Sequence, residues 1–188
     1  MPDASEADRI VRAFADFTDG AAMKSRDLVL LLLQHSPTPF ARSHFTPGHI
    51  TCTGLVLSPD TERILLVHHR RLDRWLLPGG HVESSDPSLA DTARREVVEE
   101  TSASLGPDAP LALAGIDVHG IPPKRHEPFH LHHDLVFLFR AESDRCGVSN
   151  ESRAVAWCAP DEFDRYDVPE NVRRSWRRVK TDAALRLR

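Results

Sequence analysis

The chain has 188 residues, a formal net charge of −4 at pH 7, 40% hydrophobic residues and 28% charged residues. This length and balance predict one globular domain with a core of its own, and they exclude a disordered chain, a coiled coil and a disulfide-stabilised miniprotein. No apolar run approaches the roughly 18–20 residues that a membrane span needs, and the acidic excess argues against binding to a nucleic-acid duplex.

The cysteines and the first residues of the sequence indicate a cellular compartment. Cys52, Cys146 and Cys158 form no CxxC pair, and the acidic start lacks the basic and apolar pattern of a signal peptide. An odd number of cysteines without a signal peptide is typical of reduced thiols. We therefore expect a cytoplasmic protein in which each cysteine is a small buried residue.

Residues 1–45 are predicted to form a helical extension that packs on a domain of residues 46–188. Apolar residues recur at helical spacing between Ile10 and Phe17, and a second helix is expected over 21–34. Asp19-Gly20 interrupts the two helices. A segment this short cannot bury an independent core, so it must pack on the rest of the chain.

The rest of the sequence is predicted to form five strands and two helices. The first two strands are joined by a short Pro-Asp turn and should form a hairpin. The expected strands cover 50–57, 63–69, 111–118, 131–141 and 155–158, with helices over 87–101 and about 170–187. This mixture favours an α+β fold or a mixed α/β sandwich.

The helix over 87–101 carries an unusual concentration of acid. Asp86 is a suitable N-cap and Pro87 a suitable first residue. At about 100° per residue, Glu96, Glu99 and Glu100 fall on one face near the end of the helix, where like charges repel and oppose the helix dipole. The face is either a solvated acidic surface or a site for a divalent cation.

A cation would resolve this repulsion. Hard ions such as Mg²⁺ or Mn²⁺ take oxygen ligands, and Arg95 lies four residues before Glu99, where it can hold that carboxylate. The Gly79-Gly80 turn before the helix can bring a backbone carbonyl close to the same ion.

The same segment resembles the signature of the Nudix (MutT-like) hydrolase family. The resemblance lies in Arg95-Glu96-Val97-Val98-Glu99-Glu100, in Pro78-Gly79-Gly80 upstream, and in Ala156-Trp157 with Asp161-Glu162-Phe163 downstream. It covers roughly residues 50–180. It implies a Nudix-type α/β/α sandwich with a mixed sheet, to which the N-terminal helices are added.

Two positions depart from the family pattern. The loop after Gly80 is one residue longer than usual, so Pro87 stands where the first glutamate of the signature is expected, and Asp86 or Glu83 can substitute for it. Ser102 replaces a glycine that ends the helix in a left-handed conformation, at a cost of about 1 kcal/mol.

The resemblance implies a reaction and roles for these residues. Nudix enzymes hydrolyse a diphosphate bond in a nucleoside diphosphate linked to another moiety, with divalent metal. Glu96, Glu99 and Glu100 would bind the metal together with the carbonyl of Gly79 or Gly80. Glu99 or Glu100 would be the base, and Arg95 would orient the glutamates. Two alternatives are a Nudix-fold module that binds a nucleotide without cleaving it and a diphosphate isomerase on the same fold.

Candidate substrate-binding residues lie on strands and at strand ends. His130, His132 and Asp134 alternate, so they share one face of a strand. That face is a polar wall of the substrate cleft, a solvated surface, or a separate zinc site, since His-x-His is a usual zinc spacing. Arg70 at the end of a strand is a candidate phosphate ligand, and His81 could reach the metal or the phosphate.

Three further features have simpler interpretations. Trp75 and Trp157 are expected to pack in the core rather than stack on a base. The basic helix at the end of the chain is expected to present a solvated face. The resemblance implies that the partner is a small nucleotide or related diphosphate. The N-terminal helices offer a surface through which two copies could pair as a homodimer.

Overall fold

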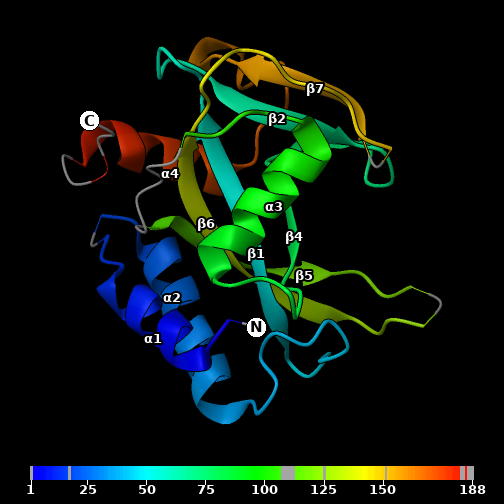
Figure 1. Ribbon diagram of the computed structural model, residues 1–188. Coiled ribbons are helices and arrows are strands. Elements are labelled where there is room, and N and C mark those ends of the chain that lie inside the picture. The colour runs from blue at the N-terminus through cyan, green and yellow to red at the C-terminus, as the bar shows by residue number, and fades with distance from the viewer. Residues whose placement is uncertain are drawn as a thin grey trace.

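Seven strands in the described part of the chain form one mixed sheet (Figure 1). The computed structural model describes residues 2–16, 18–106, 113–124, 126–150, 152–182 and 185. The strands are β1 (Gly48–Leu57), β2 (Ile64–His69), β3 (Arg74–Leu76), β4 (Gly79–His81), β5 (Leu113–Ile121), β6 (His130–Arg140) and β7 (Ser152–Cys158). The five strands expected from the sequence are present, and β3 and β4 are additional. Leu111, within one expected strand, lies outside the described residues.

The sheet is built around a parallel pair, β1 and β6. The strand order is β3-β2-β1-β6-β5, while β4 pairs with β1 and β7 pairs with β2. β1 and β6 run parallel over ten residue pairs, from Gly48↔Leu131 to Leu57↔Arg140, and the other pairings are antiparallel. The predicted hairpin of β1 and β2 is confirmed at Leu57↔Ile64. Nearer the start of β1, at residues 51–53, β4 is the antiparallel neighbour in place of β2.

Helices cover both faces of the sheet. They are α1 (Ala4–Ala13), α2 (Gly20–His35), α3 (Leu89–Thr101) and α4 (Glu170–Thr181), with a 3-10 turn at Pro160–Glu162. Buried residues of α1, α2 and α3 belong to one core cluster and those of α4 to another. This arrangement is the α/β/α sandwich with a mixed sheet that the sequence predicts.

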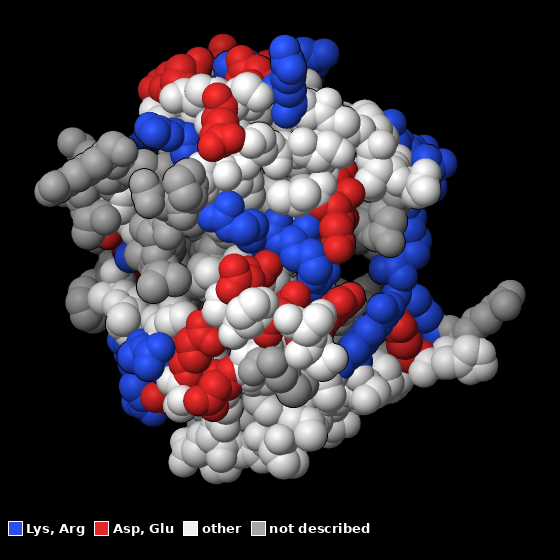
Figure 2. Space-filling model, viewed as in Figure 1, with Lys and Arg blue, Asp and Glu red and all other residues white. Residues whose placement is uncertain are grey.

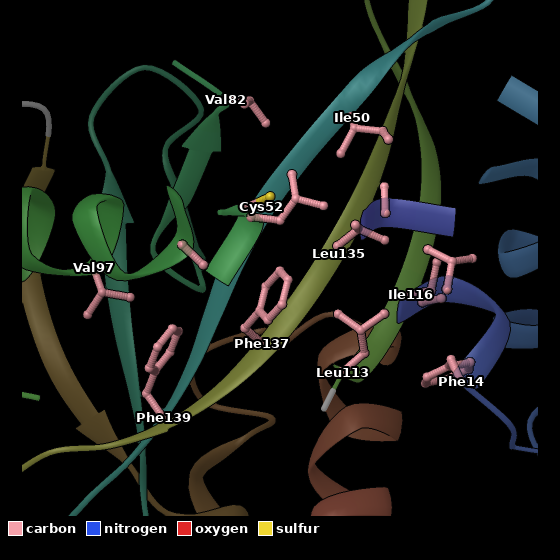
Figure 3. Packing of buried hydrophobic residues seen from close by; sticks show 14 of the residues in the cluster. Phe14, Ile50, Cys52, Val82, Val97, Leu113, Ile116, Leu135, Phe137 and Phe139 are labelled. Carbon is pink, nitrogen blue, oxygen red and sulfur yellow. The ribbon is translucent and has the colours of Figure 1, made fainter. Parts of the chain in front are cut away.

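The first core lies beneath α3 and the N-terminal helices. Alternate residues of β1 and β6, among them Cys52 and Phe137, point to this face and are at most 1% exposed. Val97 of α3 and Phe14, which follows α1, contribute to the same cluster (Figure 3). The opposite alternation supplies Leu55 to the second core.

The second core lies between the sheet and α4. Trp176 of α4 packs with Phe163, which follows the 3-10 turn, at a ring separation of 6.1 Å. Trp75 packs against this core, and Trp157 packs against the first core, as predicted. The indole N–H of Trp157 donates a hydrogen bond to the carbonyl of Asp144.

Arg174 and Arg178 of α4 do not belong to the solvated face that the sequence predicts, whereas Arg177 is exposed as expected. Arg178 pairs with Asp16 and lies over the ring of Phe14, and Arg174 pairs with Asp19 at 2.8 Å. Asp19 also caps α2 through the amides that begin the helix. The prediction was wrong for these two residues because their acidic partners lie far away in the sequence, in the segment between α1 and α2. These contacts hold that segment against α4.

Two predicted helix boundaries need correction. Ser88, and not Asp86, is the N-cap of α3, so Pro87 precedes the helix. α4 ends at Thr181, and residues 183, 184 and 186–188 of the longer predicted helix lie outside the described residues. Ser102 ends α3 with φ 52° and ψ 20°, which is the predicted left-handed conformation.

Burial separates the three cysteines. Cys52 and Cys158 are buried free thiols, as predicted, whereas Cys146 is exposed and its predicted burial was wrong. Among the described helices, none has the length and apolar character needed to cross a membrane.

Candidate active site

A cavity of about 1160 Å³ opens on the face of the sheet that α4 only partly covers. Most of its lining residues come from β1, β4, β5, β6, α3 and α4 and from the loops that flank these elements. Acidic and basic side chains lie interspersed on the side of the molecule that carries α3 (Figure 2). We call the part lined by Glu96, Glu99 and Glu100 the carboxylate end, and the part lined by His49, His81 and His132 the imidazole end.

The carboxylate end is formed where the last turns of α3 meet β4. The Gly79 amide donates a hydrogen bond of 3.0 Å to Glu100, which is 6% exposed. A Cβ at Gly80 would lie 2.6 Å from a carboxylate oxygen of Glu96, so only glycine permits this approach. The glycine pair and the helical glutamates are therefore in contact, as the sequence predicts.

Arg95 organises this end. Its guanidinium donates to Glu96 at 3.0 Å, to Glu99 at 3.1 Å and to the carbonyl of His81 at 2.9 Å. It also holds Asp86 through two bonds of 2.9 and 3.0 Å. Hydrogen bonding to Asp86 raises the pKa of Arg95 against the opposing effect of burial. The predicted contact between Arg95 and Glu99 is present.

Asp86 is a buried carboxylate, 4% exposed, that lies just before α3. Burial by itself would raise its pKa, but hydrogen bonds from Arg95, the Glu83 amide and the Thr92 hydroxyl outweigh burial and lower the pKa to about 2. Glu83 is the weaker substitute, since its carboxylate lies 4.0 Å from Arg95. Of the two acids that the sequence offers as substitutes for the first glutamate of the signature, Asp86 lies closer to Arg95.

The polar side chains of β6 line the same cavity. His130, His132 and Asp134 share its wall, as their alternation predicts. Asp134 is 7% exposed and accepts hydrogen bonds from Thr51 at 3.0 Å and Thr53 at 2.8 Å. Burial raises the pKa of Asp134. Of the three interpretations of this face, the geometry supports the wall of a cleft.

The three residues do not form the zinc site that their spacing allows. His130 donates from Nδ1 to the Pro128 carbonyl at 2.9 Å, and the threonines of β1 hold Asp134. His132 instead lies beside His49 of β1 and His81 of β4, with ring centroids 4.9 and 5.4 Å away. Potential ligand atoms of these three histidines all lie within 4.8 Å of one another.

Sequence reasoning missed His49. The residue is fully buried and faces His132 directly across the parallel pair of β1 and β6. Its only sequence signal is its place two residues before Thr51 on a strand, and that signal has no meaning until the register of the distant β6 is known.

Arg70 lies at the rim of the cavity, just beyond β2. One of its guanidinium nitrogens donates to the Ser152 carbonyl at 3.1 Å. This contact holds the Arg70 side chain against β7, the strand that pairs with β2, near the cavity. His81 lies deeper and lines both ends, because its carbonyl accepts from Arg95 while its ring faces His132.

The carboxylate end fits a hard divalent cation. The carboxylates of Asp86, Glu96 and Glu99 surround the Arg95 guanidinium, and the carboxylate of Glu100 accepts from the Gly79 amide at the same end of the cavity, so negative charge remains in excess. Carboxylate oxygens are the ligands that Mg²⁺ and Mn²⁺ prefer. The side chain of Glu96 is 16% exposed and that of Glu99 is 59% exposed. Glu96 is therefore shielded from solvent, whereas Glu99 faces the open cavity.

Comparisons with known proteins identify the family of this chain. Residues 47–179 match the sequence model of the NUDIX domain. A Bacillus subtilis (strain 168) protein, provisionally named an 8-oxo-dGTP diphosphatase, is 29% identical over 119 residues, which are 63% of this chain and 72% of that protein.

Solved structures show the same fold. The NUDIX domain of Shewanella oneidensis NrtR, complexed with ADP ribose, matches with a TM-score of 0.52 at 18% identity, over 79% of this chain and 96% of that one. A C. elegans Ap4A hydrolase matches with a TM-score of 0.52 at 17% identity, over 72% of this chain and 97% of that one. The NUDIX match extends over well more than half of the sequence, and the chain belongs to the Nudix hydrolase family.

Proposed function

We propose that this protein hydrolyses the diphosphate bond of a nucleoside diphosphate linked to another moiety, with Mg²⁺ or Mn²⁺ as cofactor. The observation that carries the proposal is the carboxylate end, where Arg95 holds Glu96 and Glu99 beside the glycine pair of β4. A sequence selected for stability alone would not gather these charges at the end of a helix.

The glutamates would hold the ion together with the carbonyl of Gly79 or Gly80. A bound divalent ion neutralises charge on phosphate oxygens and makes an attacking water more acidic. Glu96 and Glu100 are shielded, and the Gly79 amide fixes Glu100, so these two suit fixed ligands. Glu99 is the most exposed of the three and suits the acceptance of a proton from water.

Arg95 is a positioning residue in this scheme. It touches Glu96, Glu99 and the His81 carbonyl, and Asp86 fixes the guanidinium from the far side. The glutamates are therefore oriented before substrate arrives, which lowers the cost of reaching the transition state.

The rest of the cavity would bind the nucleotide. Arg70 at the rim suits a phosphate, while His81, His132 and Asp134 line the wall and suit the linked moiety or the base. The relatives named above are linked with 8-oxo-dGTP, Ap4A and ADP ribose, all of which contain a phosphoanhydride next to a nucleoside.

The free thiols of the described cysteines fit a cytoplasmic location.

A phosphate-release assay tests the proposal. The protein would be given nucleoside triphosphates, dinucleoside polyphosphates, ADP-sugars and dinucleotide cofactors, with and without Mg²⁺ or Mn²⁺. We expect metal-dependent turnover of at least one compound and a loss of at least about 100-fold in kcat for Glu99→Gln and for Glu100→Gln.

Glu62→Gln is the matched control, because this glutamate is exposed and pairs with Lys180 on the surface. It should retain full turnover. Full activity in both the Glu99 and the Glu100 variants would contradict the assigned roles, and tight binding of a nucleotide without any hydrolysis would identify a sensing module instead.

A further inference from the structure

The imidazole end gathers three histidines that the hydrolysis scheme does not need as a group. His49, His81 and His132 come from β1, β4 and β6, which lie side by side in the sheet. Their potential ligand atoms lie within 4.8 Å of one another, and their ring centroids are 4.9 to 5.4 Å apart. No carboxylate belongs to this set among the described residues.

His49 shows which nitrogen is offered. Its Nδ1 lies 3.2 Å from the His44 carbonyl, and because a carbonyl only accepts, Nδ1 must carry the proton. The lone pair therefore lies on Nε2. That atom is buried and has no hydrogen-bond partner among the described residues, in a side chain that is 0% exposed.

An orphaned nitrogen at such a depth is costly, because a buried polar atom without a partner forfeits its hydration. A carbonyl that fixes the tautomer of a ring while the other nitrogen points at a ligand is the usual arrangement around metal-bound histidine. His44 is itself held, since its Nδ1 lies 2.6 Å from the Gly48 carbonyl. The chain thus supplies a ligand and its support.

From the geometry of the cluster and the orphaned nitrogen, we propose that His49, His81 and His132 form a binding site for a divalent transition-metal ion, of which Zn²⁺ is the representative. Three imidazole nitrogens match the ligand set of zinc sites that keep a fourth position open. Here the fourth position faces the cavity, because the three residues line it.

The two ends of the cavity then select different ions. Hard Mg²⁺ prefers the oxygen ligands of the carboxylate end, whereas imidazole suits Zn²⁺ and its neighbours in the transition series. Three neutral ligands leave the full charge of the ion uncompensated, so the open position would attract a water or an anionic oxygen of a ligand in the cavity. The site does not depend on hydrolysis at the other end.

Titration calorimetry with Zn²⁺ tests the proposal, in a large excess of Mg²⁺ that occupies the carboxylate end. We expect one Zn²⁺ per chain and a loss of affinity of at least about 100-fold in His132→Gln and in His49→Gln, since even the loss of a supporting partner costs 10–100-fold. His81→Gln is a third variant at a less buried ring, should the fully buried His49 variant fail to fold.

Two matched controls define the site. His35→Gln removes an exposed histidine at the end of α2 and should bind Zn²⁺ as the wild type does. Glu99→Gln alters the carboxylate end and should also retain Zn²⁺. Co²⁺ provides a spectroscopic readout, because an ion with three nitrogens and one oxygen in tetrahedral geometry absorbs strongly in the visible range, and this absorption should disappear in His132→Gln.

Each outcome decides the matter. Zn²⁺ bound equally well by wild type and the folded histidine variants would overturn the site, as would the absence of Zn²⁺ binding by the wild type. Loss of Zn²⁺ in Glu99→Gln alone would move the ion to the glutamates. Failure of the hydrolysis assay with intact Zn²⁺ binding would leave this site standing and refute only the proposed reaction.

Discussion

The carboxylate end and the imidazole end share one cavity, but opposite forces hold them in place. Glutamates of α3 repel one another, and a single guanidinium, itself fixed by Asp86, keeps them together. The pairing of β1 with β4 and β6 places the three histidines beside one another. One end therefore depends on a charge network, whereas the other depends on backbone register.

Removal of Arg95 should break the carboxylate end most severely. Arg95→Ala leaves Asp86 buried without its partner, and loss of one member of a buried ion pair costs about 3–5 kcal/mol. Urea unfolding at pH 7 measures this free energy. Zn²⁺ binding at the imidazole end should persist in the folded fraction, because the hydrogen bond from Arg95 goes to the backbone carbonyl of His81 and the pairing of β4 with β1 still holds that residue.

Arg95→Lys is the matched variant. It keeps the charge but loses the two-pronged bond to Asp86, so we expect an intermediate loss of stability. An Arg95→Ala protein as stable as the wild type would show that the network does not hold this end.

A methyl group at Gly80 should disturb catalysis more than stability. In Gly80→Ala the new Cβ would meet a Glu96 oxygen at 2.6 Å and push that carboxylate aside. We expect a fall of about 100-fold in kcat, which corresponds to about 2.7 kcal/mol of transition-state stabilisation. Gly20→Ala, where a Cβ meets nothing within 4 Å, is the control and should leave kcat unchanged. Equal activity of both variants would contradict the close contact.

The low pKa of Asp86 predicts a dependence of stability on pH. The folded pKa, about 2, lies below the model value of 3.8, so the carboxylate contributes its full stabilisation above pH 4 and loses it as the pH falls towards 2. The contribution is on the order of 2 kcal/mol. Asp86→Asn should reduce stability at pH 7 and flatten the unfolding free energy between pH 4 and 2. An unchanged slope in this variant would place the titrating group elsewhere.

The comparison of the two ends also explains what the sequence could predict. The carboxylate end is local: helical spacing brings Glu96, Glu99 and Arg95 together, and the neighbouring glycines complete the contact. The role of Asp86 does not follow from helical spacing, because Asp86 lies in the irregular loop before α3 and the N-cap of the helix is Ser88.

The imidazole end was beyond sequence reasoning because it depends on which strand lies beside β1. His130, His132 and Asp134 were found from their alternation within one strand, but His49 needed the parallel register of β1 with β6. The prediction of a solvated face on α4 was wrong for the same reason, since Arg174 and Arg178 pair with acidic residues near the start of the chain. Contacts within one element were predictable, and contacts between distant elements were not.

A substitution at the end of α3 should have the smallest effect of these variants, and it should stabilise the protein. Ser102 holds the left-handed conformation that family members assign to glycine, and φ 52° strains a residue with a Cβ. Ser102→Gly should raise the unfolding free energy by about 0.5–1 kcal/mol. The gain is smaller than the full strain because glycine also increases the conformational entropy of the unfolded chain. Ser102→Ala keeps the Cβ and should give no gain, so a thermal melt of the two variants isolates the backbone effect. Because the last turn of α3 also carries Glu99 and Glu100, a gain in stability with unchanged kcat would show that Arg95 and β4, and not the helix end, fix the positions of the glutamates.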